Sequence, residues 1–163
     1  MMLYLRRATI EDAKDVLRWR NDPTTRENSF TKDEIDLESH LKWFEKKLGQ
    51  ENCFMYILME NDNKAGNIRV DVEDDEGEIS YMIAPEFRGK GYGKKIIGLV
   101  EETLAEAASS GDENAKQIRI LKGLTLKENV ASGKCFVANG YECSDDGDSL
   151  LFTKENLKGT NHV

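Results

Sequence analysis

Two spacings of apolar residues divide this chain of 163 residues into short elements. Short apolar or alternating runs are typical of β-strands, and they occur at 3–7, 53–60, 65–73, 78–83, 117–125, 141–143 and 149–153. Apolar residues three and four apart indicate amphipathic helices, and they occur at 9–21, 36–48, 91–108 and 129–138. The predicted order is strand, two helices, three strands, helix, strand, helix and two strands.

Proline, glycine and polar clusters mark the ends of these elements. Asn21-Asp22-Pro23 ends the first helix, because the residue before a proline is driven out of the helical region, and a polar loop is predicted from Thr24 to Thr31. Gly49 is expected to cap the second helix. Further turns or loops are predicted at 61–64, 74–77, 109–115 and 145–148. We expect one domain over residues 1–154 and a frayed tail over 155–163.

Composition narrows the classes of protein to which the chain can belong. A hydrophobic content of 39% and a charged content of 33% are typical of a folded domain. No apolar run approaches the roughly 20 residues of a membrane span, and the net charge of −8 disfavours nucleic acid but suits a cationic amine. Two histidines exclude a His-rich metal site. An odd number of cysteines without metal-ligand spacing, and no visible secretory signal, predict a cytoplasmic protein with reduced thiols: Cys53, Cys135 and Cys143.

The segment from Pro85 to Lys95 joins a predicted strand to a predicted helix and is rich in glycine. Glycine lets a backbone approach a ligand closely, and unpaired N–H groups at a helix N-terminus favour an anion. Basic side chains gather at the same place within an acidic chain. The segment therefore predicts a phosphate or pyrophosphate cradle formed by Arg88, Gly89, Lys90, Gly91, Tyr92, Gly93 and Lys94. The alternative is an ordinary strand-to-helix turn in which the glycines are needed only for the backbone conformation. The segment matches neither the Rossmann fingerprint nor the P-loop motif, so these two phosphate-binding loops are excluded.

Two motifs resemble those of the GNAT superfamily of N-acetyltransferases. The first, Arg88-x-x-Gly91-x-Gly93, is similar to the acetyl-coenzyme A loop of that family. The second is Asn129-x-x-Ser132 followed by Gly140-Tyr141. The resemblance implies a single-domain α/β fold with a mixed, mostly antiparallel sheet that is flanked by helices and splayed between 78–83 and 117–125. It also implies direct transfer of an acetyl group from acetyl-coenzyme A to a primary amine, with no metal and with the pantetheine arm in the splay.

The resemblance also assigns roles to individual residues. Backbone N–H groups of Met82 and Ile83 are expected to face the thioester, while Asn129, Ser132 and Phe136 are expected to contact the cofactor. Phe136 stands where many family members have a tyrosine, and a phenyl ring cannot protonate a departing thiolate. The remaining sources of that proton are Ser132, Tyr81 or water. Because of Phe136, a non-catalytic acyl-coenzyme A-binding module stays open as an alternative.

Glu78 is the best candidate for a general base that acts through water. It precedes Met82 and Ile83 on the same predicted strand, near the expected opening of the sheet. Side chains alternate along a strand, so Glu78, Ser80 and Met82 share one face. The alternative is an edge-strand carboxylate that belongs to the acidic turn before it.

The substrate half resembles enzymes that acetylate nucleotide-linked amino sugars, as in pseudaminic acid biosynthesis. The resemblance rests on Trp19-Arg20-Asn21, on His40-x-x-Trp43-Phe44 and on Gly66-x-Ile68-Arg69. It predicts a small-molecule amine as partner, a homodimer remaining open, and acceptor-binding roles for Trp19, Asn21, Arg26, Asn28, Arg69 and Tyr81. Rim-type acetyltransferases of protein N-termini share parts of the pattern and are the alternative. Arg26 and Arg69 suit a diphosphate. The alternative to substrate-contacting roles is that Trp19 and Trp43 are core residues and that His40 forms a local hydrogen bond on the face of its helix.

Overall fold

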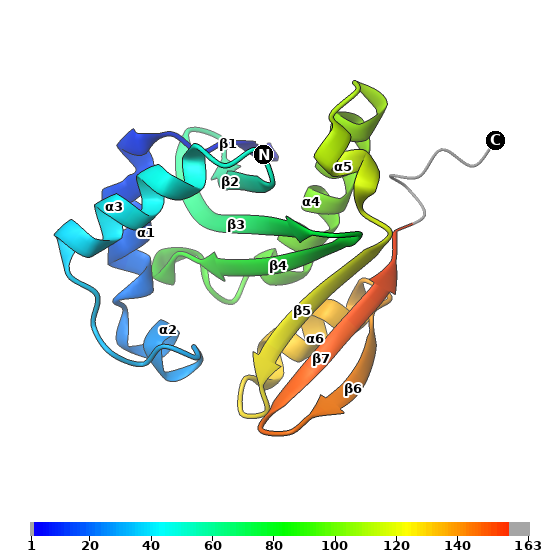
Figure 1. Ribbon diagram of the computed structural model, residues 1–163. Helices are drawn as coiled ribbons and strands as arrows, with labels where there is room; N and C mark the ends of the chain where they lie inside the picture. Colours follow the sequence, from blue (N-terminus) through cyan, green and yellow to red (C-terminus); the bar gives the residue numbers. More distant parts are fainter. Residues whose placement is uncertain (1, 157–163) are drawn as a thin grey trace.

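A computed structural model describes residues 2–156 and contains one seven-stranded sheet, shown in Figure 1. Along the sheet the strands are β1 (Leu3–Arg7), β2 (Cys53–Glu60), β3 (Asn63–Glu73), β4 (Glu76–Ile83), β5 (Ile120–Leu126), β7 (Ser149–Glu155) and β6 (Glu142–Asp146). All neighbouring strands are antiparallel except β4 and β5, which are parallel. The expected mixed, mostly antiparallel sheet is therefore confirmed.

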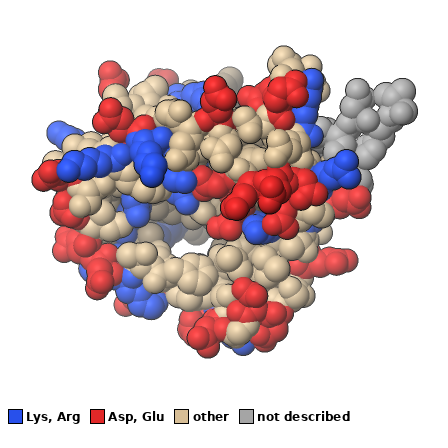
Figure 2. Space-filling model, in the orientation of Figure 1, with Lys and Arg blue, Asp and Glu red and all other residues tan. Residues whose placement is uncertain are grey.

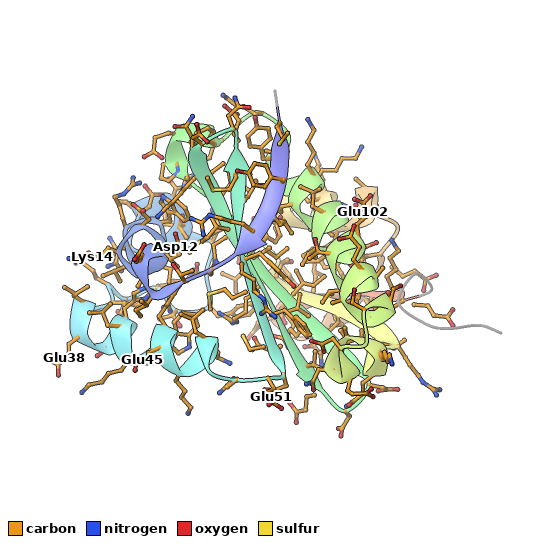
Figure 3. The ribbon with its side chains drawn as sticks, turned by 90° about the horizontal axis from the view of Figure 1, so that it is seen from above. Asp12, Lys14, Glu38, Glu45, Glu51 and Glu102 are labelled. Atoms are coloured by element: carbon orange, nitrogen blue, oxygen red, sulfur yellow. The ribbon has the colours of Figure 1, made fainter. Side chains whose placement is uncertain are left out.

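Helices cover both faces of this sheet. They are α1 (Ala13–Arg20), α2 (Pro23–Glu27), α3 (Leu37–Leu48), α4 (Tyr92–Ser109), α5 (Glu113–Gln117) and α6 (Val130–Ala138), with 3₁₀ turns η1 (Ile10–Asp12) and η2 (Pro85–Phe87). Figure 3 shows α3, which carries Glu38 and Glu45, on one side of the sheet and α4, which carries Glu102, on the other. Among residues 2–156, no helix combines the length and the apolar character needed to cross a membrane.

Alternation along the strands divides the buried side chains into two clusters. Ile68, Val70 and Ile79 pack with α4 on one face. On the other face, Met55 and Ile57 of β2 pack with Trp19 of α1 and Phe44 of α3, as Met82 of β4 also does. The expected common face of Glu78, Ser80 and Met82 is thus the face of α1 and α3. Burial of these side chains holds the helices to the sheet.

The sheet opens between β4 and β5, as expected. The two strands pair only at Glu76–Ile120, Gly77–Leu121 and Glu78–Lys122. Beyond Glu78 they separate, and Figure 1 shows β5 and β7 turning away from β4. On this side the remaining backbone groups of β4 have no neighbouring strand, so they are available to another partner.

Several element boundaries differ from the sequence-based prediction. The predicted polar loop after residue 23 begins with helix α2, because the Asp22 side chain accepts a bond from the Thr25 N–H and Pro23 occupies the first turn. The predicted loop at 109–115 contains the start of α5 for a similar reason, since Asp112 caps the Ala115 N–H. β7 continues to Glu155, within the predicted tail, and Asn156 is buried. Residues 157–163 of that tail lie outside the described residues.

A buried carboxylate ties η1 to the sheet. Asp12 is 1% exposed, and its carboxylate accepts bonds from Arg6 of β1 at 2.8 Å and from Lys64 of β3 at 2.7 Å. Figure 3 shows Asp12 beside β1. Burial alone would raise the pKa of Asp12, but these hydrogen bonds outweigh it and hold the pKa well below its usual range.

Candidate functional site

The glycine-rich segment adopts a geometry that only glycine enters without strain. Gly89 and Gly91 have φ of 79° and 77°, and Gly91 precedes α4 without any side-chain cap on the helix N–H groups. A Cβ at either position would meet nothing within 4 Å, so open space adjoins the backbone. Gly93 serves another purpose, because a Cβ there would lie 2.8 Å from Cys135 Sγ of α6. It allows α4 and α6 to pack closely.

Two basic side chains of this loop, those of Arg88 and Lys90, have acidic partners. Arg88 donates to Asp22 at 2.5 Å and to Thr25 Oγ1 at 2.9 Å, which joins the loop to α2. Lys90 lies 3.8 Å from Glu60. Lys94 is exposed at the start of α4. Tyr92, predicted to contact the cofactor, is 3% exposed and donates its hydroxyl to Glu60, so it mainly anchors the loop.

A cavity of about 440 Å³ lies over the start of α4, between β4 and α6. It brings together predicted site residues from distant parts of the chain: Asn28, Tyr81, Met82, Ile83, Arg88, Gly89, Gly91, Tyr92, Gly93, Asn129 and Ser132. Lys90 and Lys94 do not line it. The remaining lining residues, which were not among the predicted site residues, are Thr24, Thr25, Ser29, Phe87, Ala131 and Cys135. We refer to it as the cofactor cavity.

The backbone of β4 distinguishes Ile83 from Met82. Ala84 donates its N–H to Ala65 of the β3 side at 2.8 Å. N–H directions alternate along a strand, so the Met82 N–H also points to β3, where Met82 pairs with Asn67. The Ile83 N–H points to the opposite side, where β5 has turned away. Of the two predicted thioester-facing groups, the one directed into the opening is that of Ile83.

A hydroxyl pair closes the deep side of the cofactor cavity. Tyr81 Oη of β4 and Ser132 Oγ of α6 are 2.9 Å apart. Burial raises the pKa of Tyr81, so its phenol keeps its proton at neutral pH. Asn129 is the N-cap of α6: its side chain accepts from the Ser132 N–H and donates to the Asn28 carbonyl of the α2 side. It therefore links the two sides of the opening.

Phe136 packs in the core, and its predicted contact with the cofactor stays a prediction. Its ring is 2% exposed, stacks on Phe152 at 5.3 Å and does not line the cofactor cavity, but it lines a second cavity inside the opening between β4 and β5. Its Cζ points at β5, where a Cβ on Gly123 would lie only 2.2 Å away. A glycine on β5 thus makes room for the ring. The sequence showed that Phe136 cannot donate a proton, and the fold gives it a packing function.

Glu78 lies at the last pair before β4 and β5 separate. It lines a cavity of about 300 Å³ inside the opening, which we call the splay cavity, together with Ser80, Tyr81 and Thr125. At about 3.3 Å per residue it is about 13 Å along the strand from Met82. Any proton that Glu78 takes from the far end of β4 must therefore travel through water.

A third cavity, of about 220 Å³, lies on the face of α1 and α3, and we call it the acceptor cavity. Arg20, Trp43, Arg69 and Ser80 line it with Tyr81. Figure 2 shows this side of the molecule hollowed, with Lys and Arg side chains beside the hollow. Arg69 and Tyr81 were predicted here, whereas Arg20 and Trp43 were not. The alternative prediction assigned Trp43 to the core, because helical spacing alone does not distinguish a half-buried residue that lines a cavity from a fully buried core residue.

Other predicted acceptor residues serve the scaffold. Trp19 is fully buried in the core, so its predicted acceptor-binding role is wrong. Asn21 exchanges two 2.8 Å hydrogen bonds with the backbone of Ile35 and thereby fixes the segment after α2. Arg26 lines none of the three cavities. Asn28 lines the cofactor and splay cavities, and not the acceptor cavity.

The three cavities meet at two side chains. Ser29, which follows α2, and Tyr81 of β4 line all of them, and Met82 lines both the cofactor and the acceptor cavity. Within residues 2–156, no group of three or more His, Cys, Asp or Glu side chains is placed to hold a metal ion. The site is therefore built from a glycine loop, a strand that has lost its neighbour, and polar side chains of α1, α2 and α3.

The family follows from the sequence comparison. Residues 2–142 match the model of the acetyltransferase (GNAT) domain. The chain belongs to the GNAT family. It is accordingly an acyltransferase that depends on acetyl-coenzyme A. A comparison with curated proteins finds no significant sequence match.

Solved structures share the fold at low sequence identity. Aminoglycoside acetyltransferase AAC(6')-Ib in complex with coenzyme A and kanamycin has a TM-score of 0.77 at 19% identity, over 96% of both chains. Spermidine N-acetyltransferase from Vibrio cholerae, in complex with coenzyme A and spermine, has a TM-score of 0.78 at 15% identity, over 96% of this chain and 97% of the other. The ribosomal L7/L12 α-N-protein acetyltransferase RimL, in complex with coenzyme A, has a TM-score of 0.76 at 15% identity, over 95% of this chain and 94% of the other. The GNAT fold is thus confirmed.

Proposed function

We propose that this enzyme moves an acetyl group from acetyl-coenzyme A to the primary amine of a nucleotide-linked amino sugar. The observation that carries this proposal is the meeting of the cofactor and acceptor cavities at Ser29, Tyr81 and Met82. A thioester in one cavity and an amine in the other can approach each other there, which is what direct transfer requires. Three free cysteines fit a reducing, cytoplasmic setting.

The cofactor half of the proposal is supported by the loop and the opening. The uncapped N-terminus of α4 and the open space beside Gly89 and Gly91 suit a pyrophosphate. The pantetheine arm fits between β4 and β5, where the Ile83 N–H lacks a neighbouring strand. Thr125 Oγ1, in the splay cavity, is buried without a hydrogen-bond partner in the described part of the chain. An amide of the arm would satisfy it.

The chemistry needs one bond made, one broken and two proton movements. The neutral amine nitrogen bonds to the thioester carbon while the carbon–sulfur bond breaks, the nitrogen loses one proton and the thiolate gains one. We assign the Ile83 N–H to the carbonyl oxygen as negative charge develops on it. We assign the proton that the sulfur gains to the Tyr81 hydroxyl, which lies 2.9 Å from Ser132 Oγ. Glu78 is assigned the amine proton through water.

A panel of acceptors tests the proposal. Initial rates with acetyl-coenzyme A would be measured on UDP-linked amino sugars, on the same amino sugars without phosphate, on peptides with free N-termini, and on spermidine and kanamycin. We expect the sugar nucleotides to give the highest kcat/KM. Efficient acetylation of a peptide N-terminus with no use of any sugar nucleotide would establish the Rim-type alternative instead.

The base is tested on the best acceptor of that panel. Glu78→Gln keeps the shape of the side chain and removes its basicity, so kcat at neutral pH should fall by roughly 10²-fold, and by less at high pH where the amine is already neutral. Glu76→Gln is the matched control, since Glu76 lies two residues earlier on β4 and does not line the splay cavity. A Glu78→Gln enzyme with the wild-type rate at neutral pH would remove Glu78 from the mechanism.

A further inference from the structure

Two arginines from different elements meet on one aromatic ring in the acceptor cavity. The guanidinium carbon of Arg20, on α1, lies 4.5 Å from the centre of the Trp43 ring, and that of Arg69, on β3, lies 5.0 Å from it. All three side chains line the cavity, and none of its described lining residues is Asp or Glu. Such a lining is notable in a chain of net charge −8, because it reverses the sign of charge locally.

Arg20 is fixed in place without being neutralised. Its Nη1 lies 3.0 Å from His40 Nδ1, and His40 Nε2 lies 2.7 Å from the Ala13 carbonyl. A carbonyl only accepts, so Nε2 carries the proton and Nδ1 accepts from Arg20. Burial, followed by the Arg20 charge, lowers the pKa of His40 and keeps the ring neutral, although its bond to Ala13 opposes this. Within residues 2–156, no carboxylate forms an ion pair with Arg20.

The second arginine is only partly compensated. Arg69 Nε donates to Asp71 at 2.7 Å, but the same carboxylate also accepts from Lys47 at 2.9 Å. Arg69 therefore shares its one carboxylate partner with a second cation, Lys47. Burial, and then the like charge of Arg69, lowers the pKa of Arg20. A guanidinium nevertheless stays charged near neutral pH.

We infer that Arg20 and Arg69 form a subsite for an oxyanion of the acceptor, a phosphate or carboxylate that lies close to the amine. Guanidinium groups that stack on Trp43 present their N–H donors in a fixed plane, which matches the oxygens of such a group. The inference rests on the proposed function, because that function places the amine at this cavity. It also predicts rejection of polycationic acceptors, which would bring like charge to the two arginines.

Binding without turnover tests the subsite directly. The probe is UDP, titrated by calorimetry into enzyme saturated with coenzyme A, so that the cofactor cavity is filled. Arg20→Gln and Arg69→Gln should each weaken UDP binding by about 10- to 100-fold, the range expected for a lost charge-assisted contact. Arg119→Gln makes the same charge change at an exposed position outside all three cavities and should leave the Kd unchanged. Thermal melts confirm that each variant is folded.

Kinetics identify the source of the oxyanion and separate this inference from the proposed function. Amino sugar phosphates and amino acids are offered to wild type and to both variants, and a rise in KM with either class supports the subsite and names the anion. Unchanged KM and Kd in both folded variants would overturn it, as would spermidine or kanamycin proving the best acceptor. If UDP binding depends on the two arginines but no sugar nucleotide is acetylated, the subsite is supported and the proposed function is wrong. If sugar nucleotides are acetylated equally well by the wild type and by both variants, the proposed function is supported and the subsite is wrong.

Discussion

Gly91→Val is the sharpest test of the cofactor cradle. Gly91 has φ of 77° and precedes α4, so any side chain there is held in the left-handed region. That costs about 1–2 kcal/mol of stability, and more for a β-branched residue. Yet a Cβ at Gly91 meets no atom within 4 Å, so the variant should still fold. The new side chain would occupy the space assigned to the pyrophosphate, and we expect the Kd for acetyl-coenzyme A to rise by about 100-fold, or about 2.7 kcal/mol.

A second glycine supplies the matched control for this experiment. Gly147, in the turn between β6 and β7, has φ of 78° and also has nothing within 4 Å of its Cβ position. Gly147→Val therefore carries the same backbone strain without touching the cofactor cavity. Calorimetric titration of both variants should show a lower melting temperature in each and weakened cofactor binding only in Gly91→Val. If a folded Gly91→Val binds acetyl-coenzyme A as tightly as Gly147→Val, the cradle lies elsewhere.

Two further predictions concern packing and charge. Phe136→Tyr aims a hydroxyl at the Gly123 backbone, so it should lose about 1–3 kcal/mol in denaturant unfolding and gain no kcat; a faster, equally stable enzyme would contradict the core placement. Asp12→Asn should cost about 2 kcal/mol, below the usual 3–5 for a buried pair, because Arg6 and Lys64 are 34% and 30% exposed. The pKa of Asp12 is lowered by folding, so its contribution is present above about pH 4 and is lost as pH falls through the folded pKa; melting temperatures of the two proteins should converge in acid, and a constant gap would refute the assignment.

The sequence predicts the parts of this molecule that depend on local patterns. The strand at 53–60 has its predicted limits, and the glycine segment lies between a strand and a helix as expected. The opening of the sheet was also expected, but from family resemblance. Helix α2 was missed because Asp22 and Pro23 were interpreted as the end of α1, although the same two residues also start a helix.

The acceptor cavity was harder to predict because its residues are brought together by tertiary packing. Trp19 and Trp43 have similar local patterns, yet one is fully buried and the other lines a cavity between two arginines. His40 was expected to bond locally, but it bonds to α1 across 20 and 27 residues of chain. Arg20, which contacts His40, lies within the Trp19-Arg20-Asn21 motif. That motif was the sequence signal that could have identified Arg20 as a site residue.

The separation of β4 from β5 also affects how the molecule unfolds. Three residue pairs join these strands, whereas β5 and β7 share seven. Proteins open in cooperative units of unequal stability, and the segment formed by β5, α6, β6 and β7 is held to the rest by this short strand pairing and by packing against α4. A ligand that spans the opening contacts both units and favours the joined state. Bound cofactor should therefore slow amide hydrogen exchange in β7, a strand that it does not reach.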